Sequence, residues 1–270
     1  MDLNGIEEVV ERPDRGSLAG FRPGDAWLGG GTWLFSEPQP ALTRLLDLRG
    51  FGWEPLRADA DGLTIAATCT IAELERWSAP PDWRAAALVP LCCRALLGSF
   101  KVWNAATVGG NVCLALPAGP MTALAAALDG ACTIWGPDRD RAVPALDFVR
   151  GDRLTVLRPG EILREIRLPA AALRRRSAFR QISLTPQGRS GALLIGTLDI
   201  DGGFRLTVTG STVRPIAFRH PALPPRAALL GEMAAIPDEL IFGDVHGRPA
   251  WRRAVTAHLA GEILDELRAP

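Results

Sequence analysis

Residues 104–111 read Asn-Ala-Ala-Thr-Val-Gly-Gly-Asn, and this run of small residues is the most informative stretch of the chain. A glycine pair lets the backbone approach a bulky anion closely and turn its N–H groups toward it. The side chains of Thr107 and Asn111 add further hydrogen-bonding groups. The same pattern also fits an ordinary tight turn, so the segment alone does not identify a ligand.

A second glycine-rich segment, Gly29-Gly30-Gly31-Thr32, directly follows an apolar strand predicted at residues 26–28. No Gly-Lys-Thr follows, as a P-loop would require, and residues 29–34 lack the last glycine of a dinucleotide-binding fingerprint. This segment, too, could simply be a tight strand-to-helix turn. Two such loops in one region could nevertheless hold a pyrophosphate between them.

Hydrophobic patterning divides the chain into two regions with different structure. The first region is predicted to be α/β with mixed connections. The second is predicted to be a sheet with helices on one side, which is a separate α+β domain. In the second region, Phe204, Leu206 and Val208 alternate with polar residues, as in a half-buried strand. Expected strands cover residues 26–28, 42–48, 63–67, 131–135, 177–184, 192–200 and 204–209, and expected helices cover 70–77, 82–97 with an interruption at Pro90, 121–128 and 250–267.

Composition excludes several classes of protein. The 30 basic and 30 acidic residues balance, which argues against a nucleic-acid or membrane partner. The five cysteines form neither a CxxC pair nor a His/Cys cluster, so we expect no disulfide framework, iron–sulfur cluster or zinc site. The N-terminus lacks an apolar signal region and no long apolar run occurs. These features predict a soluble cytoplasmic protein.

Several segments match, in order and spacing, the motifs of one flavoprotein family. Residues 28–34 are similar to its A-G-G-T-D-L loop, residues 104–111 to R-N-x-A-T-I-G-G-N, and residues 115–120 to A-S-P-A-G-D. Further matches lie at residues 63–74, 158–163, 179–183 and 244–252. On these motifs the chain resembles the FAD-binding medium subunit of the molybdenum hydroxylases, the family of carbon monoxide dehydrogenase and xanthine dehydrogenase.

This resemblance implies an α+β fold. A two-subdomain α/β FAD-binding domain, similar to vanillyl-alcohol oxidase, would span residues 1–165. An α+β C-terminal domain, with an antiparallel sheet and helices on one face, would span 170–270. FAD would lie in the cleft between the two subdomains, with backbone N–H groups of residues 30–33 and 108–111 donating to its phosphates. The cofactor-binding positions carried over are Leu28, Gly29, Gly30, Gly31, Thr32, Trp33, Leu34, Leu97, Thr107, Val108, Gly109, Gly110, Asn111, Pro120, Leu163 and Arg180.

The resemblance also implies a function. The chain would be an oxidoreductase subunit without catalytic or metal-binding residues of its own, passing electrons from [2Fe-2S] clusters of a small subunit to an external acceptor. A large subunit with the molybdenum cofactor would complete a hetero-oligomer. The sequence departs from the family pattern at Trp33, Trp103 and Pro120, and in its short segment before Gly29. A flavin-less structural or assembly subunit therefore remains an alternative. A stand-alone flavin oxidase fits less well, because few residues follow the flavin region.

Overall fold

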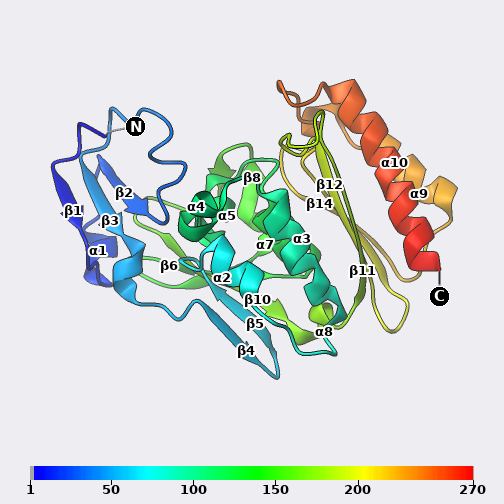
Figure 1. Ribbon diagram of the computed structural model, residues 1–270, viewed down its shortest axis with the longest axis horizontal. Coiled ribbons are helices and arrows are strands. Elements are labelled where there is room, and N and C mark those ends of the chain that lie inside the picture. Colours follow the sequence, from blue (N-terminus) through cyan, green and yellow to red (C-terminus); the bar gives the residue numbers. More distant parts are fainter. Residues whose placement is uncertain (1–2, 270) are drawn as a thin grey trace.

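The computed structural model describes residues 3–269 and places three main sheets in succession across the molecule (Figure 1). The first sheet has the order β1-β3-β2, and both pairings are parallel. Asp25, at the start of β2, accepts hydrogen bonds from Arg44 Nε at 2.8 Å and Arg44 Nη2 at 2.6 Å, which holds β2 against β3. The elements are β1 (Glu8–Val10), α1 (Gly16–Ala19), β2 (Asp25–Leu28), β3 (Arg44–Asp47) and the 3-10 helix η1 (Leu48–Phe51).

The second sheet is antiparallel, with the order β4-β5-β10-β6-β7. Its strands are β4 (Leu56–Asp59), β5 (Gly62–Ala66), β6 (Ala131–Trp135), β7 (Arg141–Pro144) and β10 (Ile162–Pro169). The other elements are α2 (Ile71–Arg76), η2 (Arg84–Ala87), α3 (Leu88–Ala95), α4 (Phe100–Ala105), α5 (Val108–Leu114), α6 (Pro120–Ala127), α7 (Ala145–Phe148), α8 (Ala170–Leu173) and the hairpin β8 (Val149–Gly151) and β9 (Leu154–Thr155). Buried residues of β5, β6, β10, α2, α3, α5 and α6 form one core.

Local sequence signals explain the helices around this core. Thr70 caps α2 by accepting from the N–H of Glu73 at 3.1 Å, and the Glu73 carboxylate accepts from the N–H of Thr70 at 2.8 Å, so the expected capping box is confirmed. The expected interruption at Pro90 is wrong. Pro90 is the third residue of α3, in the first turn, where a backbone N–H has no partner to lose. Residues 120–127 are buried throughout, as their uniformly small and apolar character predicts.

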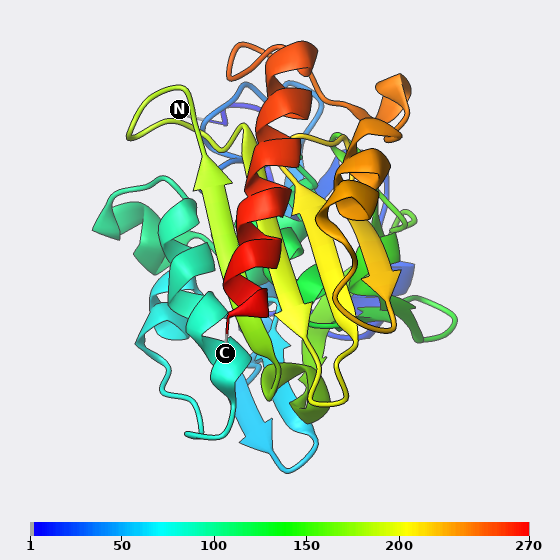
Figure 2. The ribbon, with the colours of Figure 1, turned by 90° about the vertical axis from the view of Figure 1, so that its right-hand side faces the viewer.

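The third sheet is antiparallel, with the order β11-β12-β13-β14, and two helices cover one of its faces (Figure 2). Buried side chains of α9 and α10, such as Met233 and Ile263, pack with Leu194 and Leu206 of the sheet in a second core. The elements are β11 (Arg176–Ile182), β12 (Ala192–Leu198), β13 (Phe204–Thr209), β14 (Ile216–His220), α9 (Arg226–Ala234), η3 (Asp238–Leu240) and α10 (Pro249–Arg268). The chain passes from the second sheet to the third between the end of β10 at Pro169 and the start of β11 at Arg176. The division into domains at residues 165 and 170 stays a prediction.

The third sheet is also covered on its other face, which alternation alone did not reveal. Leu193 and Ile195 of β12 belong to the first core, and α6 packs on β12 and β13. As a result Thr207 and Thr209, expected on the exposed face of a half-buried strand, are buried. The alternation of β13 is real, but the polar face meets a neighbouring helix instead of water.

An ion-pair network joins α6 to this sheet. Asp129, just after α6, accepts a hydrogen bond from Arg175 Nη1 at 2.7 Å and forms an ion pair with Arg205. Arg175 also donates from Nε to Asp199 at 2.6 Å. Burial raises the pKa of Asp129, but the hydrogen bonds from Arg205 and Arg175 outweigh this effect, and the net pKa is lowered.

No helix among the described residues is long and apolar enough to cross a bilayer.

Candidate functional site

The two glycine-rich loops lie directly against each other. A Cβ at Gly30 would lie only 1.5 Å from the carbonyl oxygen of Ala105, and a Cβ at Gly29 would lie 3.0 Å from Thr107 Oγ1. Gly31 has a left-handed backbone with φ of +73°, and a Cβ there would meet the Phe35 ring. The sequence therefore requires glycine at this contact for close approach and for backbone conformation.

The second loop is fixed to the end of β5 by its own backbone. The N–H groups of Val108 and Gly109 donate to the carbonyls of Cys69 at 2.8 Å and Ala67 at 2.9 Å. The N–H of Gly110 donates to Thr107 Oγ1 at 3.0 Å, which caps α5. The N–H of Asn111 donates to the carbonyl of Thr107 at 3.0 Å. Each of these four N–H groups thus has a partner within the chain, and donation from residues 108–111 to a phosphate stays a prediction.

The first loop, in contrast, keeps its donors free. Among the described residues, the N–H groups of residues 30–34 donate to no backbone carbonyl. They follow the carboxyl end of β2, and Gly31 turns the chain by its positive φ. Consecutive N–H groups without protein partners can surround a phosphate. The chain thus fits a phosphate-bearing cofactor, with residues 29–34 as the donor loop and residues 104–111 as its rigid support.

Predicted residues beyond the two loops occupy different positions. Asn111 Oδ1 accepts from the N–H of Met121 at 3.1 Å, which ties the second loop to the start of α6 beside the buried Pro120. Leu163 is buried in β10 with 2% exposure and belongs to the first core. Leu97 lies in the connection between α3 and α4 and is 45% exposed. The structure therefore brings Pro120 to the second loop through Asn111, whereas Leu163 is enclosed in the core.

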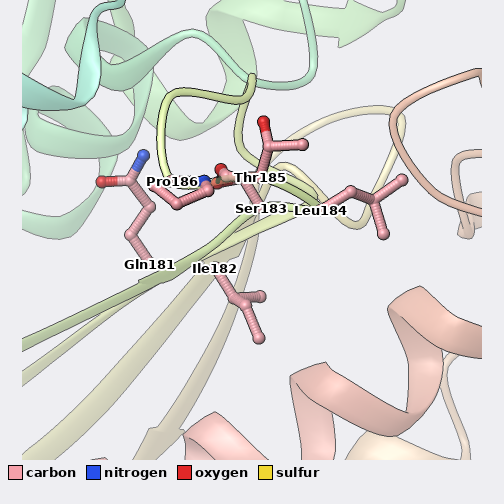
Figure 3. Close-up of a pocket in the computed structure, with 6 residues that line it drawn as sticks. All are labelled: Gln181, Ile182, Ser183, Leu184, Thr185 and Pro186. Carbon is pink, nitrogen blue, oxygen red and sulfur yellow. Dashed lines mark hydrogen bonds between the residues drawn. The ribbon is translucent and has the colours of Figure 1, made fainter.

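The structure does not bring Arg180 to the glycine loops. Its guanidinium donates from Nε to Glu262 at 2.7 Å and lies 2.7 Å from Glu266 through Nη1, and both carboxylates are on α10. Ile182, two residues further along β11, also points toward the helices, whereas Gln181 points to the opposite side (Figure 3). Alternation along the strand thus places Arg180 on the helix-covered face. Contact with a flavin would require it to leave two acidic partners.

The carboxylate of Glu161 fixes the turn that precedes β10. Its buried carboxylate accepts from Arg141 Nε at 3.0 Å, from Arg141 Nη2 at 2.7 Å and from the N–H of Arg158 at 2.8 Å. The hydrogen bonds from Arg141 lower the pKa of Glu161 despite its burial. This charge pair closes the turn before β10 and so sets the position of Leu163.

Trp33 has neighbours that sequence reasoning missed. The guanidinium carbons of Arg153 and Arg189 lie 5.3 Å and 5.9 Å from the centre of the Trp33 ring. Both arginines come from distant segments, one from the turn between β8 and β9 and one from the connection between β11 and β12. No local signal in the sequence links either arginine to Trp33.

Trp103 also departs from the family pattern, and its indole N–H donates to the carbonyl of Leu96 at 3.2 Å.

Thr122 is a second residue that sequence reasoning missed. Its hydroxyl is buried and has no hydrogen-bond partner among the described residues. A Cβ at Gly119 would lie 3.4 Å from this hydroxyl and 3.3 Å from Asn111 Oδ1, so Thr122 is close to the second loop.

A surface hollow of about 450 Å³ lies away from the glycine loops and is lined by residues 181–186 alone (Figure 3). It has no ionisable side chain and is not part of this site.

Comparison with known proteins defines the class to which the fold and the loops belong. A family model described as the FAD binding domain in molybdopterin dehydrogenase matches residues 18–171, which is more than half of the chain. The chain belongs to this family, and FAD is the cofactor that the family implies. The free donor loop at residues 29–34 agrees with that cofactor.

Individual relatives show the same relationship. The carbon monoxide dehydrogenase medium chain of Hydrogenophaga pseudoflava is 30% identical over 142 residues, covering 51% of this chain and 46% of that protein. The xanthine dehydrogenase of Oryza sativa subsp. japonica is 30% identical over 121 residues, covering 42% of this chain and 9% of that protein. The matched stretches thus span less than half of each relative.

Solved structures confirm the predicted fold class. CO dehydrogenase from Oligotropha carboxidovorans superimposes with a TM-score of 0.84 at 20% identity, covering 98% of both chains. Quinoline 2-oxidoreductase from Pseudomonas putida 86 superimposes with a TM-score of 0.81 at 19% identity, also covering 98% of both. At these identities the likeness concerns the fold, which is shared along nearly the whole chain.

Proposed function

We propose that this chain is the FAD-binding electron-transfer subunit of a molybdenum-containing hydroxylase or dehydrogenase. It would accept electrons from [2Fe-2S] clusters of a partner subunit and pass them to an external acceptor. The observation that carries the proposal is the first glycine loop, whose N–H groups at residues 30–34, just after β2, have no hydrogen-bond partner within residues 3–269. The match of residues 18–171 to the FAD-binding family supplies the identity of the ligand.

The two loops have different roles in this proposal. Residues 30–34 donate backbone hydrogen bonds to the pyrophosphate, and Gly31 supplies the turn that directs them. Residues 104–111 hold the first loop at a fixed distance through the contact between Gly30 and Ala105. Bound FAD supplies the redox chemistry, while the protein positions it and excludes competing reactions.

Asn111 and Thr122 are the candidates for further polar contacts with the cofactor. Pro120 offers no side-chain acceptor where the family pattern has an aspartate. Thr122 lies two residues later and its hydroxyl is unpaired among the described residues. We propose that this hydroxyl replaces part of the missing interaction. Thr122→Val would then weaken FAD binding, whereas Thr122→Ser would keep it.

The proposed partners are a molybdenum-cofactor large subunit and a [2Fe-2S] small subunit in a cytoplasmic hetero-oligomer. Support comes from the relatives named as medium chains of carbon monoxide dehydrogenase, a name that implies other chains. In this arrangement the chain works as an oxidoreductase only when its partners supply electrons.

Co-purification from the native source tests the subunit assignment. We expect a chromosomally tagged chain to retain an iron–sulfur protein and a molybdenum protein through several columns, with bound FAD. The same chain expressed alone should contain FAD but show little substrate-dependent turnover. A free monomer with full activity would contradict the proposal, and an intact complex without flavin would favour the structural-subunit alternative.

A further inference from the structure

A small cavity between the loop before α6, the β8–β9 turn and connections of the third sheet is lined by the two arginines that lie near the Trp33 ring. Its volume is about 200 Å³, and residues 116–118 form one wall while Phe242 and loops of the third sheet form the others. Complete small-molecule sites usually measure about 300–1,000 Å³. This cavity therefore suits one compact group of a ligand, such as a phosphate, better than a ring system.

Charged side chains in the cavity wall carry an excess of positive charge. The lining contains Arg153, Arg189 and Arg252 but only Asp152 and Asp244 as acids. Arg252 is fully engaged, because it donates to the carbonyls of residues 191, 210 and 247 and pairs with Asp244. Its charge is thus balanced within the protein, and the remaining excess lies on the other two arginines.

These two arginines are available to a ligand. The carboxylate of Glu37 lies 3.6 Å from Arg153, whose side chain is 54% exposed. Within the part of the chain that the structure describes, no carboxylate lies within ion-pair distance of Arg189. Both guanidinium groups lie near the Trp33 ring, which orients them without satisfying their N–H groups. Arginine donors held near an aromatic face suit a planar or tetrahedral anion.

The backbone under both arginines is fixed, so the arrangement is built into the fold. The N–H of Arg153 donates to the carbonyl of Ala115 at 3.0 Å, and Arg153 has a left-handed φ of 55°. Ser190, which follows Arg189, is 2% exposed, and its hydroxyl accepts from Gln181 Nε2 at 2.8 Å. The N–H of Gly210 donates to the carbonyl of Pro117 at 2.8 Å, which holds the two walls together.

We propose that this cavity binds a phosphate or pyrophosphate group through Arg153 and Arg189, whose guanidinium groups both lie near the Trp33 ring. The group could belong to FAD itself, because Trp33 is part of the donor loop, or to a separate phosphate-bearing ligand. The first source rests on the proposed function, and the second does not. The negative charge of Asp152 in the cavity wall repels a bound anion, so neutralising Asp152 should raise the affinity for phosphate.

Titration calorimetry with inorganic pyrophosphate, on FAD-free and FAD-loaded protein, tests the cavity. We expect the Arg153→Gln/Arg189→Gln double variant to lose about tenfold or more in affinity, as removal of charge-assisted hydrogen bonds implies. Asp152→Asn should bind more tightly than wild type. Arg84→Gln, an exposed arginine of η2 outside the cavity, should bind as wild type does. Circular dichroism checks that each variant is folded.

The two forms of the protein distinguish the sources of the phosphate. Pyrophosphate binding that FAD abolishes, with weaker FAD binding in the double variant, identifies the phosphates of the cofactor. Arginine-dependent binding that persists in FAD-loaded protein identifies a separate ligand. Pyrophosphate binding to neither form, or binding that the double variant leaves unchanged, overturns the proposal. FAD binding is measured separately by visible absorbance, so failure of the proposed function is recognised independently.

Discussion

Gly30→Ala tests the contact between the two glycine loops most severely. The new Cβ would lie 1.5 Å from the carbonyl oxygen of Ala105 and 2.5 Å from its carbonyl carbon. Ordinary contacts of a Cβ are 3.4–4 Å, so the loops must separate by about 2 Å. The obstacle is backbone and cannot rotate away as a flexible side chain could. The donor loop would therefore be displaced from its support.

The expected cost follows from this displacement. Overpacking a well-packed contact costs about 1–3 kcal/mol, and a backbone clash belongs at the upper end of that range. For a chain of this size, about 3 kcal/mol corresponds to a decrease in Tm of roughly 6–12 °C. The FAD content of the purified protein should fall as well, because the free N–H groups of residues 30–34 lose their fixed position.

Thermal denaturation and the visible flavin spectrum, measured on the same preparations, provide the assay. Gly231→Ala is the matched control, since a Cβ there meets nothing within 4 Å and the residue lies inside α9. It should keep its FAD and should be unchanged or slightly more stable, because alanine favours helix over glycine. Gly29→Ala should have an intermediate effect, since its Cβ meets only the Thr107 hydroxyl at 3.0 Å.

The order of the three variants decides the outcome. If Gly30→Ala has the same Tm as wild type and retains FAD, the loops are not in the contact described. If Gly29→Ala is more damaging than Gly30→Ala, the donor loop rests on Thr107 and the reasoning from backbone contact fails.

Three further predictions concern the frame around the site. Glu161→Gln should lower the free energy of unfolding by about 3 kcal/mol, because it leaves Arg141 without its buried partner. Because folding lowers the pKa of Glu161, its carboxylate stabilises the protein above its ordinary pKa of 4.5, and this stability is lost as pH falls through the pKa of the folded state. The denaturant midpoint of wild type should therefore drop in acid more steeply than that of Glu161→Gln. Asp129→Asn should cost about 2 kcal/mol by weakening the contact of α6 with the third sheet, and a midpoint equal to wild type would show that the network contributes nothing. Thr70→Ala should cost about 1 kcal/mol through loss of the α2 cap, whereas Thr70→Ser should be close to wild type in Tm.

Features that depend on neighbouring residues could be predicted from the sequence. The capping box at Thr70 and Glu73, the buried helix at residues 120–127 and the terminal helix of α10 all have local signals. The two glycine loops could be located for the same reason. Their mutual contact could be expected only through resemblance to a family, since nothing in residues 29–32 points to residues 104–111.

Features that depend on tertiary packing could not be predicted. The N–H groups of Val108 and Gly109 donate to carbonyls just after β5, a pairing that no local signal in the sequence indicates. Arg180 pairs with two glutamates of α10 that lie more than eighty residues later. The approach of Arg153 and Arg189 to Trp33 likewise depends on how the loop after β2, the β8–β9 hairpin and the third sheet are placed. Long-range pairing of this kind leaves no periodic or spacing signal.

The stoichiometry of FAD tests the central claim most directly. The protein is purified, titrated with FAD and desalted, and the flavin released by denaturation is compared with the protein concentration. A parallel titration with FMN, which lacks the pyrophosphate bridge, shows whether the donor loop at residues 30–34 is used. The structure predicts one FAD per chain and much weaker binding of FMN. No retained FAD, or equal binding of the two flavins, would contradict the account.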